Sequence, residues 1–387
     1  MHQHCGQSLV AKREDYMNVG KVRKLLLLLC ISVCCLAEST RPQTERQTFS
    51  GSSTNESYGD HTPLAIQALQ SYYDLQTGLY KTTGWWNSAN AITVLADYSR
   101  SVSSHGYDFV FSNTLSAAEK KFPGFINEYY DDEGWWALAW IDVYRHTGDS
   151  RYLEAAEFIF RDMSYGWDDT CSGGIWWSKK RNYKNAIANE LFLSVAAELA
   201  EEVPSLRERG DYRTWAEREW KWFARSGMIN KSHLVNDGLD VNCENNGRTI
   251  WTYNQGVILG GLAALSKFDR SPSVLHQANE IAKASISTLI DAHGILHENC
   301  DPSCGADGTQ FKGIFVRNLV ALNKAQHGVA SYKEFILANA RSIWTQVQPP
   351  DYHLGESWAA PFGNANASTQ SSALDTLVGA ASIQKSP

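Results

Sequence analysis

Two adjacent carboxylates in the segment Asp131–Trp136 (Asp-Asp-Glu-Gly-Trp-Trp) are the residues of this chain best suited to chemistry. Asp131 and Asp132 follow a Tyr pair and precede a Trp pair, at a point where a helix is expected to begin. A pair of carboxylates supplies the acid, base or nucleophile that cleaves a glycosidic bond. The structural alternative is a helix cap, since negative charge stabilises a first turn. The same aromatic pattern recurs elsewhere in the chain, and this favours a site.

Aromatic and amide residues gather in six segments that precede alternate helices. Eight of the fourteen tryptophans fall in them: Trp85, Trp86, Trp135, Trp136, Trp176, Trp177, Trp251 and Trp358. Aromatic rings stack on the apolar faces of sugars, and amides bond to hydroxyl groups. The segments therefore predict one surface for a neutral polyhydroxylated ligand, although core packing is the alternative for any single Trp. The candidate ligand-binding residues are Trp85, Trp86, Asn87, Tyr130, Trp135, Trp136, Trp176, Trp177, Tyr183, Asn185, Asn189, Tyr253, Asn254 and Gln255.

Two of these polar positions and a second acidic pair have structural alternatives. Asn185 and Asn189 lie four residues apart on one helix face, which suits either ligand binding or a cap with a buried amide. Asp168-Asp169 precedes Cys171, and we expect it to form an Asx-type turn there. No P-loop, nucleophile elbow or metal-binding helix motif occurs, so we expect no cofactor and no catalytic metal.

The N-terminus has the composition of a secretory leader. Basic residues at 21–24 precede an apolar run from Leu25 to Leu36, which ends in Ala37. A basic region, an apolar run of this length and a small residue predict a signal peptide that is cleaved near Ala37. The run is too short to cross a bilayer comfortably. We therefore expect residues 1–37 to be a signal peptide with an upstream extension, and the mature protein to be secreted.

The net charge excludes several classes of partner. Removal of the leader takes away five basic and two acidic residues, so the formal charge falls from −7 to −10. A chain this acidic is poorly suited to nucleic acid or anionic membranes. The segment from Ala373 to Pro387 has no hydrophobic tail of the kind that a lipid-anchor signal needs. We expect a soluble extracellular monomer with no nucleic-acid partner and no membrane anchor.

Four cysteines follow the leader, and an even number in an oxidising compartment predicts disulfides. They are Cys171, Cys243, Cys300 and Cys304. Three pairings are possible, and we favour Cys300–Cys304, which closes a short turn, together with Cys171–Cys243. A zinc site of Cys300 and Cys304 with His293 and His297 is the alternative. Three Asn-x-Ser sequons predict N-glycosylation, at Asn55, Asn230 and Asn366.

Most of the chain has a helical pattern. Residues 38–60 are rich in Ser, Thr, Gln and Gly, which predicts a disordered lead-in. From Thr62 onward apolar residues recur at spacings of three and four, and no stretch alternates as a strand does. We expect residues 61–387 to form a single catalytic domain. Its expected helices are 62–75, 87–102, 108–122, 134–147, 150–163, 185–202, 211–226, 251–268, 272–291, 311–327, 331–347 and 367–382.

The expected helices are of two alternating kinds. Odd-numbered ones are amphipathic, as in Tyr152–Phe158, and even-numbered ones are apolar nearly all round, as in Gly256–Leu265. A helix that is apolar on every side is buried. Six buried helices alternating with six half-exposed ones predict an all-α fold of two concentric rings, an (α/α)6 barrel of six helical hairpins. A superhelical solenoid of hairpins is the alternative. In the barrel, all the aromatic segments lie at one end.

The string Tyr129–Trp140 (YYDDEGWWALAW) closely resembles the signature of glycoside hydrolase family 76, the endo-α-1,6-mannanases. Further matches are Gly173–Trp177, Tyr183–Phe192 and Trp251–Leu262, and the resemblance runs from about residue 62 to 382. It implies an (α/α)6 barrel, in agreement with the helix pattern. It also implies retaining hydrolysis of internal α-1,6-mannosidic bonds in mannan.

By the same resemblance, Asp131 is the nucleophile and Asp132 the acid/base. Asp132 must then stay protonated near neutrality, and we expect the charge of Asp131 and the apolar wall of Trp135 and Trp136 to raise its pKa. Some members of the family are membrane-anchored proteins thought to transfer mannan-bearing glycans. A mannan transglycosylase of cell-wall assembly is therefore the alternative function, and a non-catalytic mannan-binding protein is a further one.

Overall fold

All twelve expected helices are present in residues 57–385, the part of the chain that the computed structural model describes. The six helices expected to be buried are α2 (Trp85–Ser101), α4 (Tyr130–Thr147), α6 (Ala186–Glu202), α8 (Thr252–Leu265), α11 (Phe311–Ala325) and α13 (Ala367–Lys385), and we call them the inner helices. The six helices expected to be half-exposed are α1 (Tyr58–Gln70), α3 (Asp108–Ala118), α5 (Ser150–Ser164), α7 (Leu206–Phe223), α9 (Pro272–Thr288) and α12 (Ala330–Trp344), and we call them the outer helices. The expected leader and nearly all of the expected lead-in lie outside the described residues.

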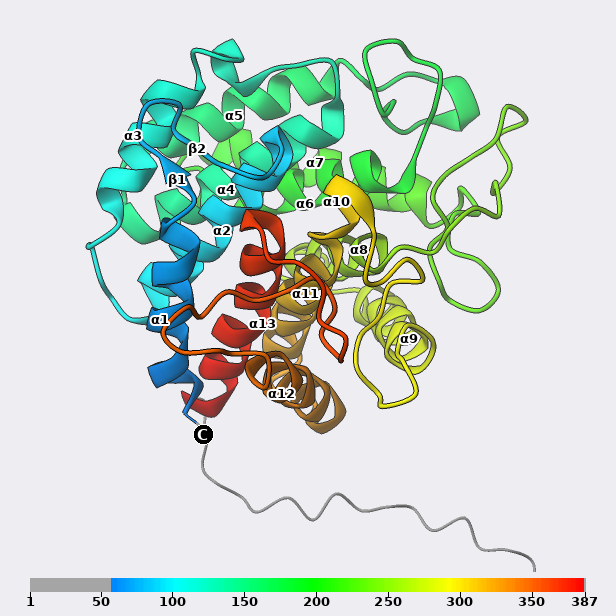
Figure 1. The fold of residues 1–387 in the computed structure, drawn as a ribbon. Helices are drawn as coiled ribbons and strands as arrows, with labels where there is room; N and C mark the ends of the chain where they lie inside the picture. Colours follow the sequence, from blue (N-terminus) through cyan, green and yellow to red (C-terminus); the bar gives the residue numbers. More distant parts are fainter. Residues whose placement is uncertain (1–56, 386–387) are drawn as a thin grey trace, which may run out of the picture. The chain divides into compact units, whose positions relative to one another are not determined.

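The six inner helices form a closed ring. α2 packs on α4, α4 on α6, α6 on α8, α8 on α11 and α11 on α13, and α13 returns to α2. Outside this ring α5, α7 and α9 pack on α4, α6 and α8, while α1 and α12 flank α13 (Figure 1). A solenoid has two open ends, so the contact between α13 and α2 excludes it. The fold is the predicted (α/α)6 barrel.

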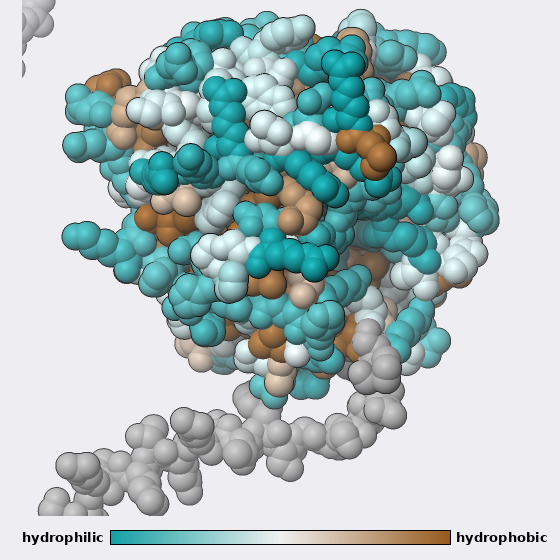
Figure 2. All heavy atoms as spheres, turned by 180° about the vertical axis from the view of Figure 1, so that it is seen from behind, coloured by the Kyte–Doolittle hydropathy of each residue, from teal (hydrophilic) through white to brown (hydrophobic). Residues whose placement is uncertain are grey.

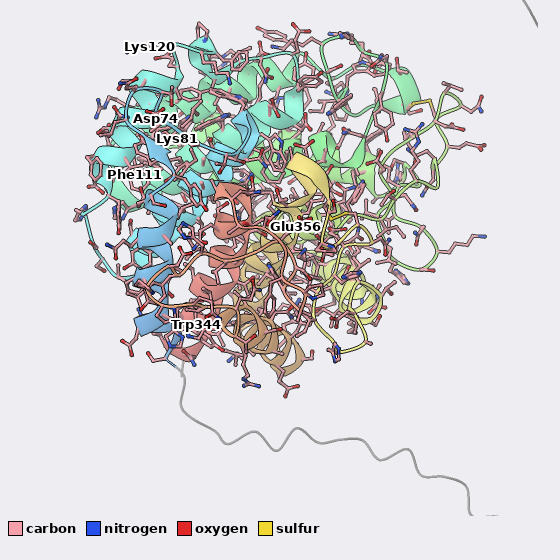
Figure 3. The ribbon with its side chains drawn as sticks, viewed as in Figure 1. Asp74, Lys81, Phe111, Lys120, Trp344 and Glu356 are labelled. Carbon is pink, nitrogen blue, oxygen red and sulfur yellow. A yellow bond between two sulfur atoms is a disulfide. The ribbon has the colours of Figure 1, made fainter. Side chains whose placement is uncertain are left out.

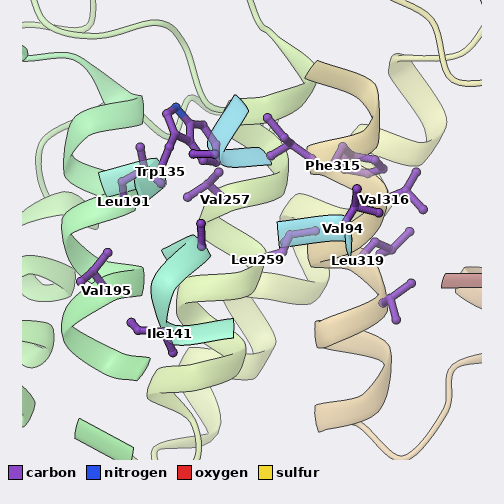
Figure 4. Packing of buried hydrophobic residues seen from close by; sticks show 14 of the residues in the cluster. Val94, Trp135, Ile141, Leu191, Val195, Val257, Leu259, Phe315, Val316 and Leu319 are labelled. Carbon is purple, nitrogen blue, oxygen red and sulfur yellow. The ribbon is translucent and has the colours of Figure 1, made fainter. Parts of the chain in front are cut away.

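Burial in the two rings follows the sequence pattern. Every residue of α8 except Tyr253 is buried. In α5, by contrast, the buried residues all belong to one face: Tyr152, Leu153, Ala156, Ile159, Phe160 and Met163. Figure 4 shows Trp135, Leu191 and Val257 meeting from α4, α6 and α8 inside the inner ring. The helices that are apolar on every side are therefore the ones that other helices surround.

Glycines let the inner helices approach closely. A Cβ added at Gly134 of α4 would lie 2.7 Å from the Cβ of Leu191 on α6. One added at Gly256 of α8 would lie 2.5 Å from the Cα of Phe315 on α11. Any other residue at these positions would push two inner helices apart, so glycine sets the diameter of the ring at these contacts.

Some boundaries differ from the expected ones. α1 begins at Tyr58, so it includes the last three residues of the expected lead-in. α4 begins at Tyr130 rather than 134, because the Tyr130 amide is held by the carbonyl of Trp177 at 2.9 Å. Elements too short to leave a periodic pattern were not predicted. They are β1 (Tyr73–Asp74), β2 (Leu79–Tyr80), the 3-10 turns η1 (Pro123–Phe125) and η2 (Thr170–Ser172), and α10 (Gly305–Gly308).

One disulfide joins two distant loops and a second closes a short turn. Cys171 pairs with Cys243, and Cys300 pairs with Cys304, which confirms the favoured connectivity. The alternative zinc site is wrong, because both of its sulfurs are joined to each other. Glu356, labelled in Figure 3, accepts a hydrogen bond from the Cys304 backbone N at 2.6 Å and so anchors the C-terminal loop to this turn.

The C-terminal ends of the inner helices enclose a cavity of about 460 Å³ that is lined by ion pairs. The Arg145 guanidinium on its wall contacts two further lining residues, Glu198 at 3.0 Å and Asp142 at 3.4 Å, and also Glu202 at 2.8 Å. These carboxylates come from α4 and α6, so the charges join neighbouring helices of the ring at this end.

The visible surface of the described residues is largely polar. The face seen in Figure 2 is mostly polar, with small and separate apolar patches. Among residues 57–385, no helix combines the length and the apolar character needed to cross a bilayer.

Candidate active site

The N-terminal ends of the six inner helices lie at one end of the barrel, because each returns to that end through an outer helix (Figure 1). We call this region, with the loops that precede these helices, the aromatic end. Asp131 and Asp132 stand here in the first turn of α4, and both are half-buried. The N-cap position belongs to Tyr129. Neither Asp131 nor Asp132 is therefore the N-cap residue of α4.

Each carboxylate receives a hydrogen bond from outside α4. The indole Nε1 of Trp177 donates to Asp131 Oδ2 at 3.0 Å. The Asn127 amide donates to Asp132 Oδ2 at 2.6 Å. Asp131 Oδ1 is buried and has no hydrogen-bond partner among the described residues. Hydrogen bonds from two loop residues thus hold the pair in place.

Burial raises the pKa of both carboxyls. For Asp131 burial is the larger cause and the neighbouring charge of Asp132 the next, and together they hold its pKa well above the usual range. Burial raises the pKa of Asp132 to about 6, the Asn127 hydrogen bond opposes this rise, and the charge of Asp307 adds to it. The pair thus keeps a proton at a pH where two isolated carboxyls would both be ionised. The expected rise at Asp132 is present, although Asp307 is the nearby charge that contributes to it.

A row of rings flanks the carboxylates. Trp86 of α2 stacks on Trp135 of α4 at 5.5 Å between centroids and on Phe311 of α11 at 6.2 Å. Phe311 in turn stacks on Tyr253 of α8 at 3.9 Å. The Trp86 indole also donates to Asp307 at 2.9 Å. Four inner helices thus contribute to one aromatic wall, in which Trp135 and Phe311 are buried and support the half-buried Trp86 and Tyr253, whose rings suit a pyranose ring.

The loop before α6 supplies a second group of aromatic residues near the Asp pair. Trp176, Trp177 and Tyr183 line a pocket of about 620 Å³ together with Asn246 and Arg248. The Tyr183 hydroxyl donates to Asp237 and accepts from Asn246 at 2.9 Å. This pocket adjoins the Asp pair, because Trp177 lines the pocket and its indole also donates a hydrogen bond to Asp131.

Several expected ligand contacts are corrected by burial. Trp85 and Trp136 pack on each other at 4.8 Å and around Phe125, inside the protein core. The amide of Asn87 accepts from the backbone N of Gly84 and caps α2. These three residues shape the site from behind and do not line it.

Three amide residues fix loop backbone. Asn189 is fully buried and bonds to both the N–H (2.7 Å) and the carbonyl (3.0 Å) of Ile175. Gln255 does the same for Val235, at 2.7 and 2.8 Å. Asn185 caps α6 through the Ala188 amide. The structural alternative therefore holds for all three, and the expectation of direct ligand contact is corrected.

The remaining candidates differ in exposure. Tyr130 is buried, while Trp176 is half-buried and donates to Asp168 at 2.7 Å. Asp168 also accepts from the Thr170 amide at 3.0 Å, as expected for an Asx-type turn. Asn254 is buried, and its amide has no hydrogen-bond partner among the described residues.

Three residues at the aromatic end were not predicted: Asn127, Asp237 and Asp307. Each of them bonds to a predicted residue, Asn127 and Asp237 from loops and Asp307 from the short helix α10, and none of these segments has a periodic pattern. Only the closeness of Asn127 to the Asp pair in the sequence offered a signal.

The sequons have different environments. Asn55 lies outside the described residues. The Asn230 amide donates to Asn236 at 2.9 Å, whereas Asn366 uses its side-chain oxygen to accept from the Thr369 amide at 3.0 Å. Both side chains are half-buried.

A closed helical barrel with a carboxylate pair beside an aromatic wall has the architecture of a carbohydrate-active (α/α)6 protein. The family model described as Glycosyl hydrolase family 76 matches residues 57–387, and the chain belongs to this family.

Two curated relatives are mannan endo-1,6-alpha-mannosidases. DFG5 of Candida albicans is 29% identical over 290 residues, 66% of this chain and 63% of the relative. DCW1 of Saccharomyces cerevisiae is 29% identical over 303 residues, 68% of this chain and 64% of the relative. The chain spans less than two thirds of the length of these two relatives.

Solved structures share the fold. The alpha-1,6-mannanase of Salegentibacter sp. HEL1_6 has a TM-score of 0.75 at 24% identity, over 85% of this chain and 100% of that one. An inactive variant of that mannanase, altered at two aspartates, is in complex with alpha-1,6-mannotetrose, with a TM-score of 0.75 at 23% identity over 85% and 100%. Dfg5 from Chaetomium thermophilum, in complex with glucosamine, has a TM-score of 0.75 at 18% identity over 88% and 93%.

Proposed function

We propose that this protein is a retaining glycoside hydrolase that cleaves internal α-1,6-mannosidic bonds of mannan. The observation that carries the proposal is the Asp131–Asp132 pair, half-buried and hydrogen-bonded at the aromatic end of a family 76 barrel. The names of the relatives supply the substrate class.

In this proposal Asp131 attacks the anomeric carbon and forms a glycosyl ester. Asp132 protonates the departing oxygen and then deprotonates the water that cleaves the ester. One proton shared by the pair is what this division of labour requires. Because the pKa of Asp131 is also raised, the free pair holds its proton partly there. Binding of the sugar oxygen beside Asp132 then favours the form in which Asp131 is ionised.

The protein is further proposed to be secreted, to act as a monomer and to need no membrane anchor. The two disulfides support an oxidising compartment.

The test is incubation of the purified chain with linear α-1,6-mannan and with branched yeast mannan, followed by sizing of the products. A ladder of oligosaccharides that is α-configured when first released supports a retaining endo-hydrolase. Products longer than the substrate, formed when acceptor oligosaccharides are abundant, would assign transglycosylation. Binding with no product from either polymer would contradict both and favour a mannan-binding protein.

A further inference from the structure

A cluster of two histidines and one aspartate lies at the barrel end opposite to the Asp pair. His105 belongs to the loop between α2 and α3, Asp108 is the first residue of α3, and His146 stands in the last turn of α4. Asp108 bridges the rings, with Oδ2 2.8 Å from His105 Nδ1 and Oδ1 2.8 Å from His146 Nε2.

The three donor atoms are already close together. One ligand atom from each residue lies within 4.8 Å of the other two. A tetrahedral zinc ion held at about 2.0–2.1 Å keeps its ligand atoms roughly 3.3 Å apart, so a small closure is needed. The exposed His105 can provide it, since 69% of its side chain is accessible, whereas only 3% of the His146 side chain is.

His146 is held in a defined orientation. Its ring packs edge-on against Phe111 of α3, labelled in Figure 3, and stacks on His105 at 5.0 Å between centroids with an angle of 29° between the ring planes. The C-terminal end of α4 adds the partial negative charge of its carbonyl groups, which favours a bound cation.

We propose that His105, Asp108 and His146 form a zinc site. Two imidazoles and a carboxylate are a donor set that Zn²⁺ accepts, and the exposed side of the cluster leaves a fourth position for water. On binding, each coordinating nitrogen offers a lone pair in place of an N–H bond. The imidazole proton therefore moves to His105 Nε2 and to His146 Nδ1.

The ion joins the loop between α2 and α3 to the end of α4, and its role is to stabilise the fold. His146 is 15 residues from Asp131 along one helix, which corresponds to about 22 Å. Zinc at this position touches neither of the residues proposed to react. The site is independent of the proposed function.

The experiment uses the full chain without a histidine tag, after treatment with a chelator. Zinc chloride is added in calorimetric and thermal-unfolding titrations. We expect one equivalent of Zn²⁺ to bind and the Tm to rise with zinc concentration, as for any ligand specific to the folded state. Mannan hydrolysis, where present, is expected to be unchanged.

Two variants test the ligands and one serves as a control. His105→Ala and Asp108→Asn should fold as the parent does without metal, yet lose the bound equivalent and the rise in Tm. His276→Ala, which removes an exposed histidine of α9, should keep both. In the parent, Co²⁺ should give the strong visible absorption of a tetrahedral ion, and this absorption should be absent from His105→Ala.

Two results would overturn the proposal. One is the absence of stoichiometric zinc binding, which would leave Asp108 as a purely structural bridge between two histidines. The other is an equal rise in Tm for His105→Ala and the parent, which would assign the metal to unrelated surface groups.

Discussion

The indole of Trp177 donates a hydrogen bond to Asp131 at 3.0 Å, although the two residues are 46 positions apart in the chain. The contact depends on the loop before α6, which also pairs its backbone with Tyr130. Trp177 therefore both orients the proposed nucleophile and stabilises its ionised form.

Replacement of Trp177 by Phe keeps an aromatic ring and removes this donor. A hydrogen bond to a charged group contributes about 1.5–3 kcal/mol, so we expect kcat to fall roughly 10- to 100-fold. Trp176→Phe is the matched control, because its indole donates to Asp168 instead. Steady-state kinetics on α-1,6-mannan would check this, and equal losses in the two variants would contradict the assigned role.

The two carboxylates should respond differently to amidation. Asp131→Asn should abolish turnover on every substrate, because no covalent intermediate can form. Asp132→Asn should slow mannan cleavage by about 10²- to 10⁴-fold, but affect far less the first step with an activated leaving group. Azide should partly rescue Asp132→Asn and give an α-mannosyl azide, detected by NMR. A β product would indicate inversion, and near-normal rates in both variants would reduce the pair to a helix cap.

The acid side of the pH profile of kcat/KM should reflect the ionisation of Asp131 and Asp132. Burial raises the pKa of Asp132 to about 6. Below that pH both carboxyls are protonated and no nucleophile remains. We therefore expect kcat/KM to fall as the pH drops through about 6, and to fall again at higher pH when the pair loses its last proton.

Substitution of two neighbours of Asp132 should shift the acid side of the pH profile, its acid limb, in opposite directions. Asn127→Ala removes a hydrogen bond that lowers the pKa of Asp132, so the limb should shift to higher pH. Asp307→Asn removes a negative charge that raises this pKa, so the limb should shift to lower pH. Glu280→Gln, a change at a half-buried position of α9, should leave the profile unmoved. Shifts of the same sign in the first two variants would refute the electrostatic account.

Asn189 should contribute to the stability of the fold and not to substrate binding. Asn189→Leu leaves the buried N–H and carbonyl of Ile175 without partners, which should reduce the free energy of unfolding by about 2–5 kcal/mol. Asn182→Leu, at an exposed position of the same loop, should change it little. Urea denaturation compares the two variants. A stable Asn189→Leu protein with weakened substrate binding would instead restore Asn189 as a ligand residue.

The two disulfides should contribute unequally to the free energy of unfolding. Cys171–Cys243 encloses a separation of 72 residues and Cys300–Cys304 only 4. Chain entropy then predicts losses of about 4 and about 2 kcal/mol when each pair is replaced by alanine. Thermal unfolding of the two double variants gives the order, and the reverse order would show that native contacts outweigh loop entropy.

The helices and their division into two rings were predictable because their cause is local in the sequence. Apolar residues on one face of Tyr152–Phe158 and on all sides of Gly256–Leu265 specify how much of each helix can meet water. The place of the Asp pair at the start of an inner helix was predictable for a similar reason, because the two residues and their neighbours are adjacent in the chain.

The role of each aromatic residue was decided only by the tertiary structure. Trp85 and Trp86 are adjacent and identical, yet Trp85 packs in the core and Trp86 stacks over Trp135 at the aromatic end. Successive residues of a helix point about 100° apart, so one member of a pair faces inward and the other toward the site. Which one does so depends on how the helix is rotated in the closed ring. That rotation is set by contacts between segments far apart in the chain, and these contacts also bring Trp177 to Asp131.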